Sequence, residues 1–182
     1  EEATPPQFSQ SARLRDGTPV RVRSIRADDR QRIIDAFRKL EPSTIYTRFF
    51  SAKKELSEAD LKRIDASDFV HAVALVATLG EGADEIIIGG GAYTVLDRPG
   101  EPPTAEVSFT IEEDYQGQGL SGLFMRLLTQ VGRERGIRRF EAEVLAGNTP
   151  MLKVFQRSGL PMQSQVEDGV VHVVMELGPQ SA

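Results

Sequence analysis

The chain has 182 residues, of which 40% are hydrophobic and 27% are charged. This composition is typical of one folded domain with a proper core, and no apolar run reaches the roughly eighteen residues of a membrane-spanning helix. Because there are no cysteines, disulfides, thiolate metal sites and cysteine nucleophiles are excluded, and a reducing cytoplasm is the expected location. The net charge of −5 argues against a nucleic-acid partner and weakly favours a cationic substrate such as an amine.

Both ends of the chain are predicted to be tails, at residues 1–10 and 179–182, around a single domain at 11–178. The first residue is not methionine, so we expect a processed chain or a piece of a longer protein, without a signal peptide. His71 and His172 lie within apolar, strand-like runs. They are predicted to pack in a sheet rather than to catalyse or to bind a metal.

The expected elements alternate between strands and helices. Asp16-Gly17 marks a turn before a strand at 20–23, and Asp28 or Asp29 is expected to cap a helix at about 30–40. The later elements are helical turns after Pro42 and Ser57, strands at 69–78, 86–96 and 105–111, a helix at 120–135, a strand at 140–145, a helix at 150–158 and a hairpin around Asp168-Gly169. Glycines 89–91 suggest a bulge. Together these elements predict one mixed α/β domain.

A glycine-rich loop joins the strand at 105–111 to the helix at 120–135. It reads Gln116, Gly117, Gln118, Gly119, Leu120, Ser121, Gly122. Glycines let backbone N–H groups approach a ligand closely, and the first helical turn adds unpaired donors and the positive end of the helix dipole. The loop therefore predicts a phosphate cradle that needs neither lysine nor metal.

Three other interpretations of this loop compete with the phosphate cradle. The plainest is a turn whose glycines only cap the helix. Gly117, Gly119 and Gly122 also match the dinucleotide-binding spacing, with Glu141 and Glu143 about twenty residues further on. However, five residues separate the strand from the first glycine, and too little chain follows for the parallel strands of that fold. A P-loop is excluded because no Gly-Lys-Ser/Thr is present.

Two motifs resemble those of the GNAT superfamily of acyltransferases. The family's pyrophosphate loop has the form Gln/Arg-x-x-Gly-x-Gly/Ala, which Gln116, Gly119 and Ser121 match with a serine at the last position. The segment Asn148–Leu160 resembles the family's Asn-x-x-(small or apolar)-x-x-x-Tyr-x-x-x-Gly-Phe signature, with Phe155 in place of the tyrosine. The two motifs occur in the family's order.

The resemblance extends over residues 14–177 to the acetyltransferase domain of bacterial Pat-type protein-lysine acetyltransferases. It rests on Asp16–Thr18, Ile25–Asp29 and especially Tyr46–Ser51. It implies a mostly antiparallel central sheet flanked by helices and splayed between its fourth and fifth main strands. It also implies acetyl-CoA as co-substrate, no metal, and a protein lysine as acceptor, for example on an acyl-CoA synthetase. The alternatives are a small amine, such as a polyamine or antibiotic, and a non-catalytic acyl-CoA-sensing module.

Acyl transfer to an amine requires a base, because a free lysine amine has a pKa near 10.4 and is protonated at neutral pH. Glu106, Ser108 and Thr110 share the polar face of their strand, and Pat-type enzymes carry a catalytic glutamate in the corresponding strand. Glu106 is therefore our candidate base, against the plainer interpretation of a solvated strand face. The acids at 112–114 are expected to form a solvated edge, or to supply the base instead.

The resemblance also implies which residues bind the cofactor. They are Phe109, Thr110, Ile111, Gln116, Gly117, Gln118, Gly119, Leu120, Ser121, Gly122, Asn148 and Phe155. A strand N–H is the expected oxyanion donor. Asn148 is expected to hydrogen-bond the pantetheine arm, to cap the next helix, or both. Phe155 cannot protonate the leaving thiolate as a tyrosine would, so solvent supplies that proton, or the ring belongs to the core.

Overall fold

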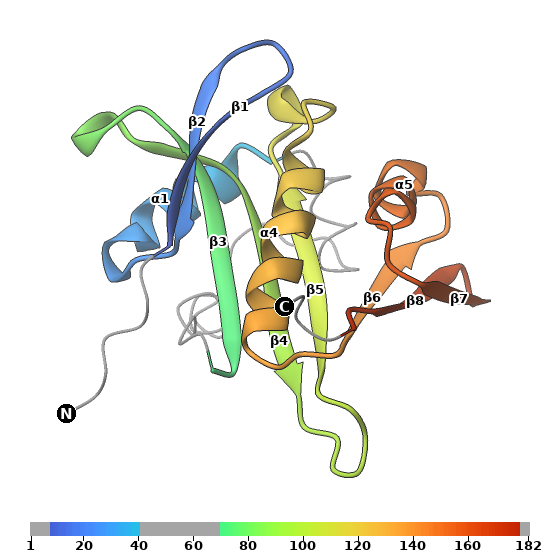
Figure 1. The fold of residues 1–182 in the computed structure, drawn as a ribbon. Helices are drawn as coiled ribbons and strands as arrows, with labels where there is room; N and C mark the ends of the chain where they lie inside the picture. Colours follow the sequence, from blue (N-terminus) through green and yellow to red (C-terminus); the bar gives the residue numbers. More distant parts are fainter. Residues whose placement is uncertain (1–7, 41–69, 179–182) are drawn as a thin grey trace, which may run out of the picture.

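The computed structural model describes residues 8–40 and 70–178. Within them lies an eight-stranded sheet with the order β1-β2-β3-β4-β5-β6-β8-β7 (Figure 1). The strands are β1 (Ser9–Arg13), β2 (Pro19–Ser24), β3 (Ala72–Leu79), β4 (Ile86–Leu96), β5 (Thr104–Ile111), β6 (Arg139–Leu145), β7 (Met162–Glu167) and β8 (Val170–Glu176). Only β5 and β6 run parallel, so the predicted mixed, mostly antiparallel sheet is confirmed.

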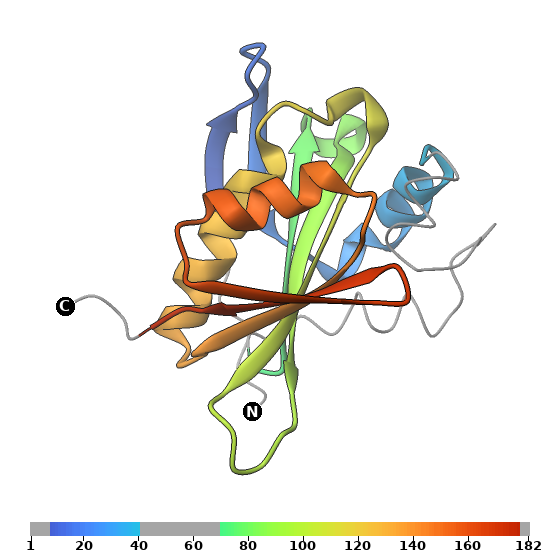
Figure 2. The ribbon, with the colours of Figure 1, turned by 90° about the vertical axis from the view of Figure 1, so that its right-hand side faces the viewer.

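Helices cover both faces of the sheet. In the described residues they are α1 (Arg30–Arg38), α4 (Leu120–Glu134) and α5 (Thr149–Arg157), with short 3-10 turns η1 (Ala27–Asp29), η2 (Gly82–Asp84) and η3 (Glu113–Tyr115). Helix α4 packs on the central strands, and α5 lies beside it over the β6–β8 end of the sheet (Figure 2). Helix α1 contacts β4 and faces a cavity on the side of the sheet opposite α4.

The glycines of β4 let α4 approach the sheet. A Cβ added at Gly91 would lie 2.9 Å from Cβ and Cγ of Phe124, which is fully buried on α4. Such contacts are too short for any larger residue without movement of the helix. The predicted bulge is also present one residue before the glycine run, since Ala77 pairs with Gly89 and Thr78 with Ile87.

Strands β5 and β6 separate soon after they meet. They pair only where Thr104–Glu106 lies beside Arg139–Glu141, although β5 continues to Ile111 and β6 to Leu145. The predicted splay is therefore confirmed. It lies between the fifth and sixth strands of the sheet, because β1 is an additional strand.

The N-terminal hairpin corrects one sequence prediction. We expected residues 9 and 10 to belong to a flexible tail, but they begin β1, which pairs with β2 along its full length. The Asp16-Gly17 turn closes this hairpin, with Gly17 in the left-handed region at φ +90°. The turns expected after Pro42 and Ser57, and the motif Tyr46–Ser51, lie outside the described residues.

Asp29 also differs from its predicted role. Its side chain does not cap α1 but accepts hydrogen bonds from both terminal nitrogens of Arg23 at 2.8 Å and from the backbone N–H of Arg26 at 2.6 Å. Burial alone would raise the pKa of Asp29, but these donors hold that pKa below its ordinary value. Arg23 also donates to Glu85 at 3.0 Å, so one buried guanidinium links β2 to both carboxylates.

Candidate active site

The glycine-rich loop forms an open wall at the N-terminus of α4. Gly117 and Gly119 have φ of +77° and +89°, a region that other residues enter only with strain. No side chain caps the helix, and nothing lies within 4 Å of a Cβ added at Gly117 or Gly122. The backbone donors of the first turn are thus left without side-chain caps beside open space, as a phosphate cradle requires.

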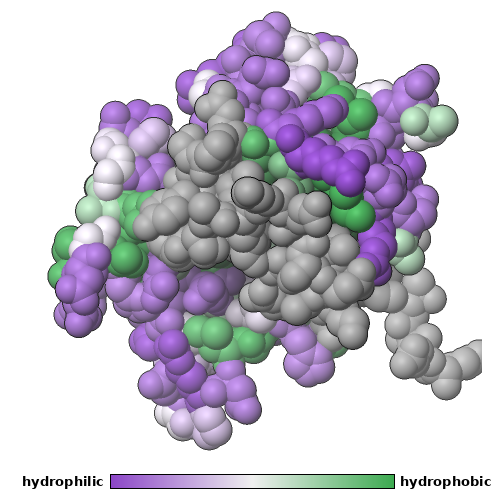
Figure 3. Space-filling model, turned by 180° about the vertical axis from the view of Figure 1, so that it is seen from behind, coloured by the Kyte–Doolittle hydropathy of each residue, from purple (hydrophilic) through white to green (hydrophobic). Residues whose placement is uncertain are grey.

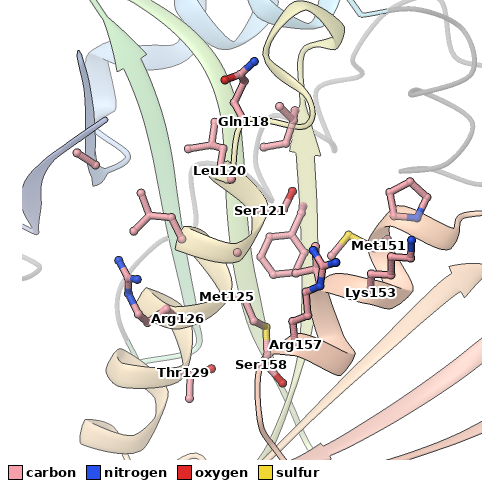
Figure 4. A pocket seen from close by; sticks show the side chains of 18 of the residues that line it. Gln118, Leu120, Ser121, Met125, Arg126, Thr129, Met151, Lys153, Arg157 and Ser158 are labelled. Atoms are coloured by element: carbon pink, nitrogen blue, oxygen red, sulfur yellow. The ribbon is translucent and has the colours of Figure 1, made fainter. Parts of the chain in front are cut away.

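The loop borders a cleft of about 1610 Å³ that continues between α4 and α5. All seven predicted residues from Gln116 to Gly122 line it, together with Asn148. Met125 and Thr129 of α4 and Met151 of α5 form part of its wall (Figure 4). The glycine-rich loop, α4 and α5 all contribute residues to the cleft, and its walls carry both apolar and polar groups.

Basic side chains that the sequence motifs did not indicate also line this cleft. Arg126 comes from α4, and Lys153 and Arg157 from α5 (Figure 4). Positive charges in a cleft that also contains a helix N-terminus favour an anionic ligand with several phosphates. The available signal was the position of these residues on the predicted helices that flank the loop.

The tip of the β1–β2 hairpin holds the glycine-rich loop. The backbone N–H of Arg15 donates to the carbonyl of Gln118 at 3.2 Å, and that of Asp16 donates to Gln118 Oε1 at 3.1 Å. The Arg15 side chain donates to the carbonyl of Gly117 at 3.2 Å. Residues about a hundred positions apart in the sequence therefore fix the loop. The side-chain oxygen of Gln118 is used in a hydrogen bond within the protein.

Gln116 likewise bonds within the protein. Its Nε2 donates to the carbonyl of Ile111 at 3.0 Å, at the end of β5. We expected Gln116 and Gln118 to belong to the cofactor contacts. Both line the cleft, and their side chains brace the loop from which backbone donors are offered.

Strand β5 separates the cleft from a second cavity. Phe109 and Ile111 line the cleft, whereas Glu106, Ser108 and Thr110 line a cavity of about 290 Å³ on the other face of the sheet. This division follows from the alternation of side chains along a strand. Thr110, expected among the cofactor contacts, therefore presents its side chain to the second cavity.

The second cavity combines apolar walls with carboxylates. Ile33 and Phe37 of α1 contribute to the walls, and Glu106 and Glu112 are among the lining residues. Burial, and next the charge of Asp114, raises the pKa of Glu112. On this side of the molecule, seen from behind in Figure 3, hydrophobic patches alternate with hydrophilic surface.

Asn148 lies at the cleft, whereas Phe155 lies in the core. Asn148 is the N-cap of α5, where its Oδ1 accepts from the backbone N–H of Met151 at 3.3 Å, and it also lines the cleft. Phe155 is 1% exposed and packs against Phe109 with ring centroids 6.0 Å apart. It is absent from the cleft lining, so its expected cofactor contact is replaced by a place in the core.

The two histidines do not pack as predicted. His71 is exposed, and His172 is partly exposed on β8, with Nε2 3.9 Å from Glu141 Oε2.

Among the residues described, no cluster of three or more histidine or acidic side chains has the geometry of a metal site. The helices at 30–38, 120–134 and 149–157 are too short or too polar to cross a membrane.

The sequence model of the "Acetyltransferase (GNAT) family" matches residues 35–160, which include the glycine-rich loop and the Asn148 motif. The chain belongs to the GNAT acetyltransferase family. A curated relative, Acetyltransferase PA5475 of Pseudomonas aeruginosa, is 32% identical over 161 residues, covering 87% of this chain and 85% of the relative.

Other GNAT proteins place the chain near Pat-type enzymes. Acetyltransferase Pat of Mycolicibacterium smegmatis is 31% identical over 147 residues, which are 80% of this chain but only 42% of that protein. The crystal structure of the GNAT domain of S. lividans PAT superposes with a TM-score of 0.82 at 36% identity, covering 92% of this chain and 96% of that one. The structure of yncA from Salmonella typhimurium with acetyl-CoA shares the fold, with a TM-score of 0.69 at 17% identity.

Acetyl-CoA is the co-substrate of this GNAT chain, and the first cleft fits it. The open glycine loop and uncapped helix suit the pyrophosphate, and the basic side chains of the cleft suit its other phosphate. Beyond Glu106 the edge of β5 no longer pairs with β6, which leaves backbone groups for an extended amide-bearing ligand. The chain is an acetyl-CoA-dependent acetyltransferase.

Proposed function

We propose that this chain transfers an acetyl group from acetyl-CoA to the side-chain amine of a protein lysine, with Glu106 as general base. The observation that carries the proposal is the position of Glu106. It lines the second cavity, on the face of β5 opposite the cofactor cleft, at the last residue before β5 and β6 separate. An amine in this cavity would reach the thioester through the opening between the strands.

The residues divide the chemistry as follows. Acetyl-CoA supplies an activated thioester. Glu106 accepts a proton from the ammonium group, directly or through one water, so that the neutral amine attacks the carbonyl. A backbone N–H on the free edge of β5 donates to the carbonyl oxygen as charge develops there. Since Phe155 is buried and has no hydroxyl, solvent protonates the departing thiolate, whose thiol has an ordinary pKa of about 8.5.

The form of the second cavity favours lysine as the acceptor. Ile33 and Phe37 offer apolar surface for an aliphatic stem, and Glu106 and Glu112 offer negative charge for an ammonium group. The similarity to Pat-type enzymes supports a lysine on a folded protein, such as an acyl-CoA synthetase.

Substitution of the base tests the mechanism. We expect Glu106→Gln to keep wild-type affinity for acetyl-CoA while turnover falls by roughly 10²–10⁴, the usual contribution of a general base. The loss should shrink as pH rises, because the amine then loses its proton unaided. Glu112→Gln is the matched control, since Glu112 lines the same cavity. Full turnover of Glu106→Gln together with loss in Glu112→Gln would transfer the role to Glu112.

A separate experiment tests the acceptor. The enzyme and labelled acetyl-CoA are incubated with purified acyl-CoA synthetases and, in parallel, with spermidine, aminoglycosides and free amino acids. We expect label on synthetase lysines and measurable thiol release with that acceptor. Label on small amines alone, at efficient turnover, would refute the protein-lysine assignment. Tight acetyl-CoA binding without thiol release in any mixture would favour the sensing module.

A further inference from the structure

An ion pair spans the point at which β5 and β6 separate. Arg98, in the connection between β4 and β5, donates from its NH1 to Glu141 Oε1 on β6 at 2.6 Å. In the sheet order β5 lies between β4 and β6, so this ion pair joins the β4–β5 connection to the strand on the far side of β5. The Glu141 side chain is only 9% exposed, and that of Arg98 is 41% exposed.

Glu106 lies next to the β6 member of this ion pair. It pairs with Thr94 of β4 on one side and with Glu141 of β6 on the other. In-register residues of neighbouring strands point to the same face and are about 4.8 Å apart at the backbone. Glu106 and Glu141 are therefore neighbours on one face of the sheet, and Arg98 pairs with the second of them.

The electrostatics follow from this arrangement. In general, a neighbouring carboxylate disfavours the ionised form of a carboxyl group, and a nearby guanidinium favours it. The pKa of Arg98 is raised chiefly by its hydrogen bond to Glu141, and the charge of Glu106 contributes to the same direction. The guanidinium thus pairs with Glu141, and the charge of Glu106 acts on it at longer range.

We propose that Arg98 and Glu141 are positioning residues that together set the charge of Glu106, Arg98 favouring its ionised form and Glu141 opposing it. The proposal rests on the proposed function, in which Glu106 is the base. Neither residue needs to touch the substrate. Their opposite charges give the proposal its test, because removing each one must change the pH dependence in an opposite direction.

Other charged groups face the same region and contribute to its background. Glu101 lies 3.9 Å from Arg98, and His172 lies 3.9 Å from Glu141. Glu143 follows on the same face of β6, and Glu112 lines the cavity with Glu106. Since these groups stay in place in every variant below, the comparisons isolate the contribution of the ion pair.

The experiment measures the acid limb of the pH profile of kcat/KM, which reports the base of the free enzyme. For Arg98→Met we expect the limb to move to higher pH by roughly 0.5–1 unit, less than the full effect of a close charge because Arg98 is partly exposed. For Glu141→Gln we expect a similar movement to lower pH. The double variant should lie between the two, and Arg98→Lys should restore the wild-type limb.

Controls separate this effect from damage to the fold and from net charge. Arg21→Met removes the same charge from β2, three strands from β5 in the sheet order, and should leave the limb unchanged. At that distance an exposed charge is largely screened. Affinity for acetyl-CoA, measured by titration, should be unchanged in all variants because the cofactor cleft lies on the other face of β5.

The profile of Glu106→Gln distinguishes the two levels of the argument. If its residual activity keeps the wild-type acid limb, another group is the base and the proposed function fails. If that limb is lost, but Arg98→Met and Glu141→Gln both keep it in place or move it in the same direction, the base stands and the role of the ion pair is refuted.

Discussion

The cradle formed by the glycine-rich loop is tested by replacing Gly119 with valine. Gly119 has φ +89°, where a side chain costs about 1–3 kcal/mol, and a β-branched residue is among the worst accommodated. No atom lies closer than 3.8 Å to an added Cβ, so the cost comes from the backbone rather than from a clash. We expect a fall in Tm of about 2–4 °C for each kcal/mol in a domain of this size.

The effect on binding should exceed this strain. If the backbone relaxes out of the left-handed region, the N–H groups of Leu120 and Ser121 turn away from the position that a pyrophosphate requires. We expect the affinity for acetyl-CoA to fall at least about tenfold, or ~1.4 kcal/mol, in a calorimetric titration.

Gly136→Val is the matched control. Gly136 has φ +84°, nothing lies within 4 Å of its added Cβ, and it follows the opposite end of α4. This variant should lose similar stability yet bind acetyl-CoA as the wild type does. Wild-type affinity in a folded Gly119→Val protein, or equal loss in both variants, would refute the cradle. Binding of NADH by the wild type in the same titration would revive the dinucleotide interpretation.

Further predictions concern the buried ion pair of Asp29, the packing of α4 on the sheet, and the contact between the hairpin tip and the glycine-rich loop. Asp29→Asn should lower the free energy of unfolding by about 3 kcal/mol in urea titrations, because the buried Arg23 guanidinium loses one of its two carboxylate partners and keeps only Glu85. The pKa of Asp29 in the folded protein lies below its ordinary value of 3.8. The stability that this group contributes to the wild type is therefore present above pH 3.8 and is lost as the pH falls through the lowered pKa. An Asp29→Asn variant whose stability falls with acid as much as that of the wild type would contradict this. Gly91→Ala should cost about 1–3 kcal/mol in thermal denaturation, because its Cβ would meet Phe124 at 2.9 Å, and unchanged stability would mean that α4 shifts freely. Gln118→Ala should speed amide exchange at Asp16 and weaken acetyl-CoA binding about 2–10-fold, whereas unchanged exchange would show that the hairpin tip is held by other contacts.

Local patterns in the sequence predicted most of the described fold. Helix α4 ends one residue before its predicted end, because its apolar residues recur with the period of a helix. Strand β4 has its predicted bounds, because its sequence is an apolar run. The same reasoning missed β1, whose residues Ser9–Arg13 alternate only weakly between exposed and partly buried positions. As an edge strand it depends on its partner β2 rather than on its own pattern.

The candidate site could be predicted only in part. The cradle followed from glycines adjacent in sequence, but the hydrogen bonds from Arg15 and Asp16 to Gln118 join distant positions and leave no local pattern. The same holds for Arg98 and Glu141, which the sheet order brings together. For Phe155 the sequence left both a cofactor contact and a place in the core open, because the choice depends on how α5 packs on the sheet.

The alternation of side chains along β5 has a consequence for how such an enzyme diversifies. Phe109 and Ile111 belong to the wall of one compartment, and Ser108 and Thr110 to that of the other. Replacing Ser108 or Thr110 remodels one chamber while the lining of its neighbour is untouched. In the proposed function, the selectivity for the acceptor amine can therefore change by substitutions at alternate positions of β5 without changes in the residues that line the acetyl-CoA cleft.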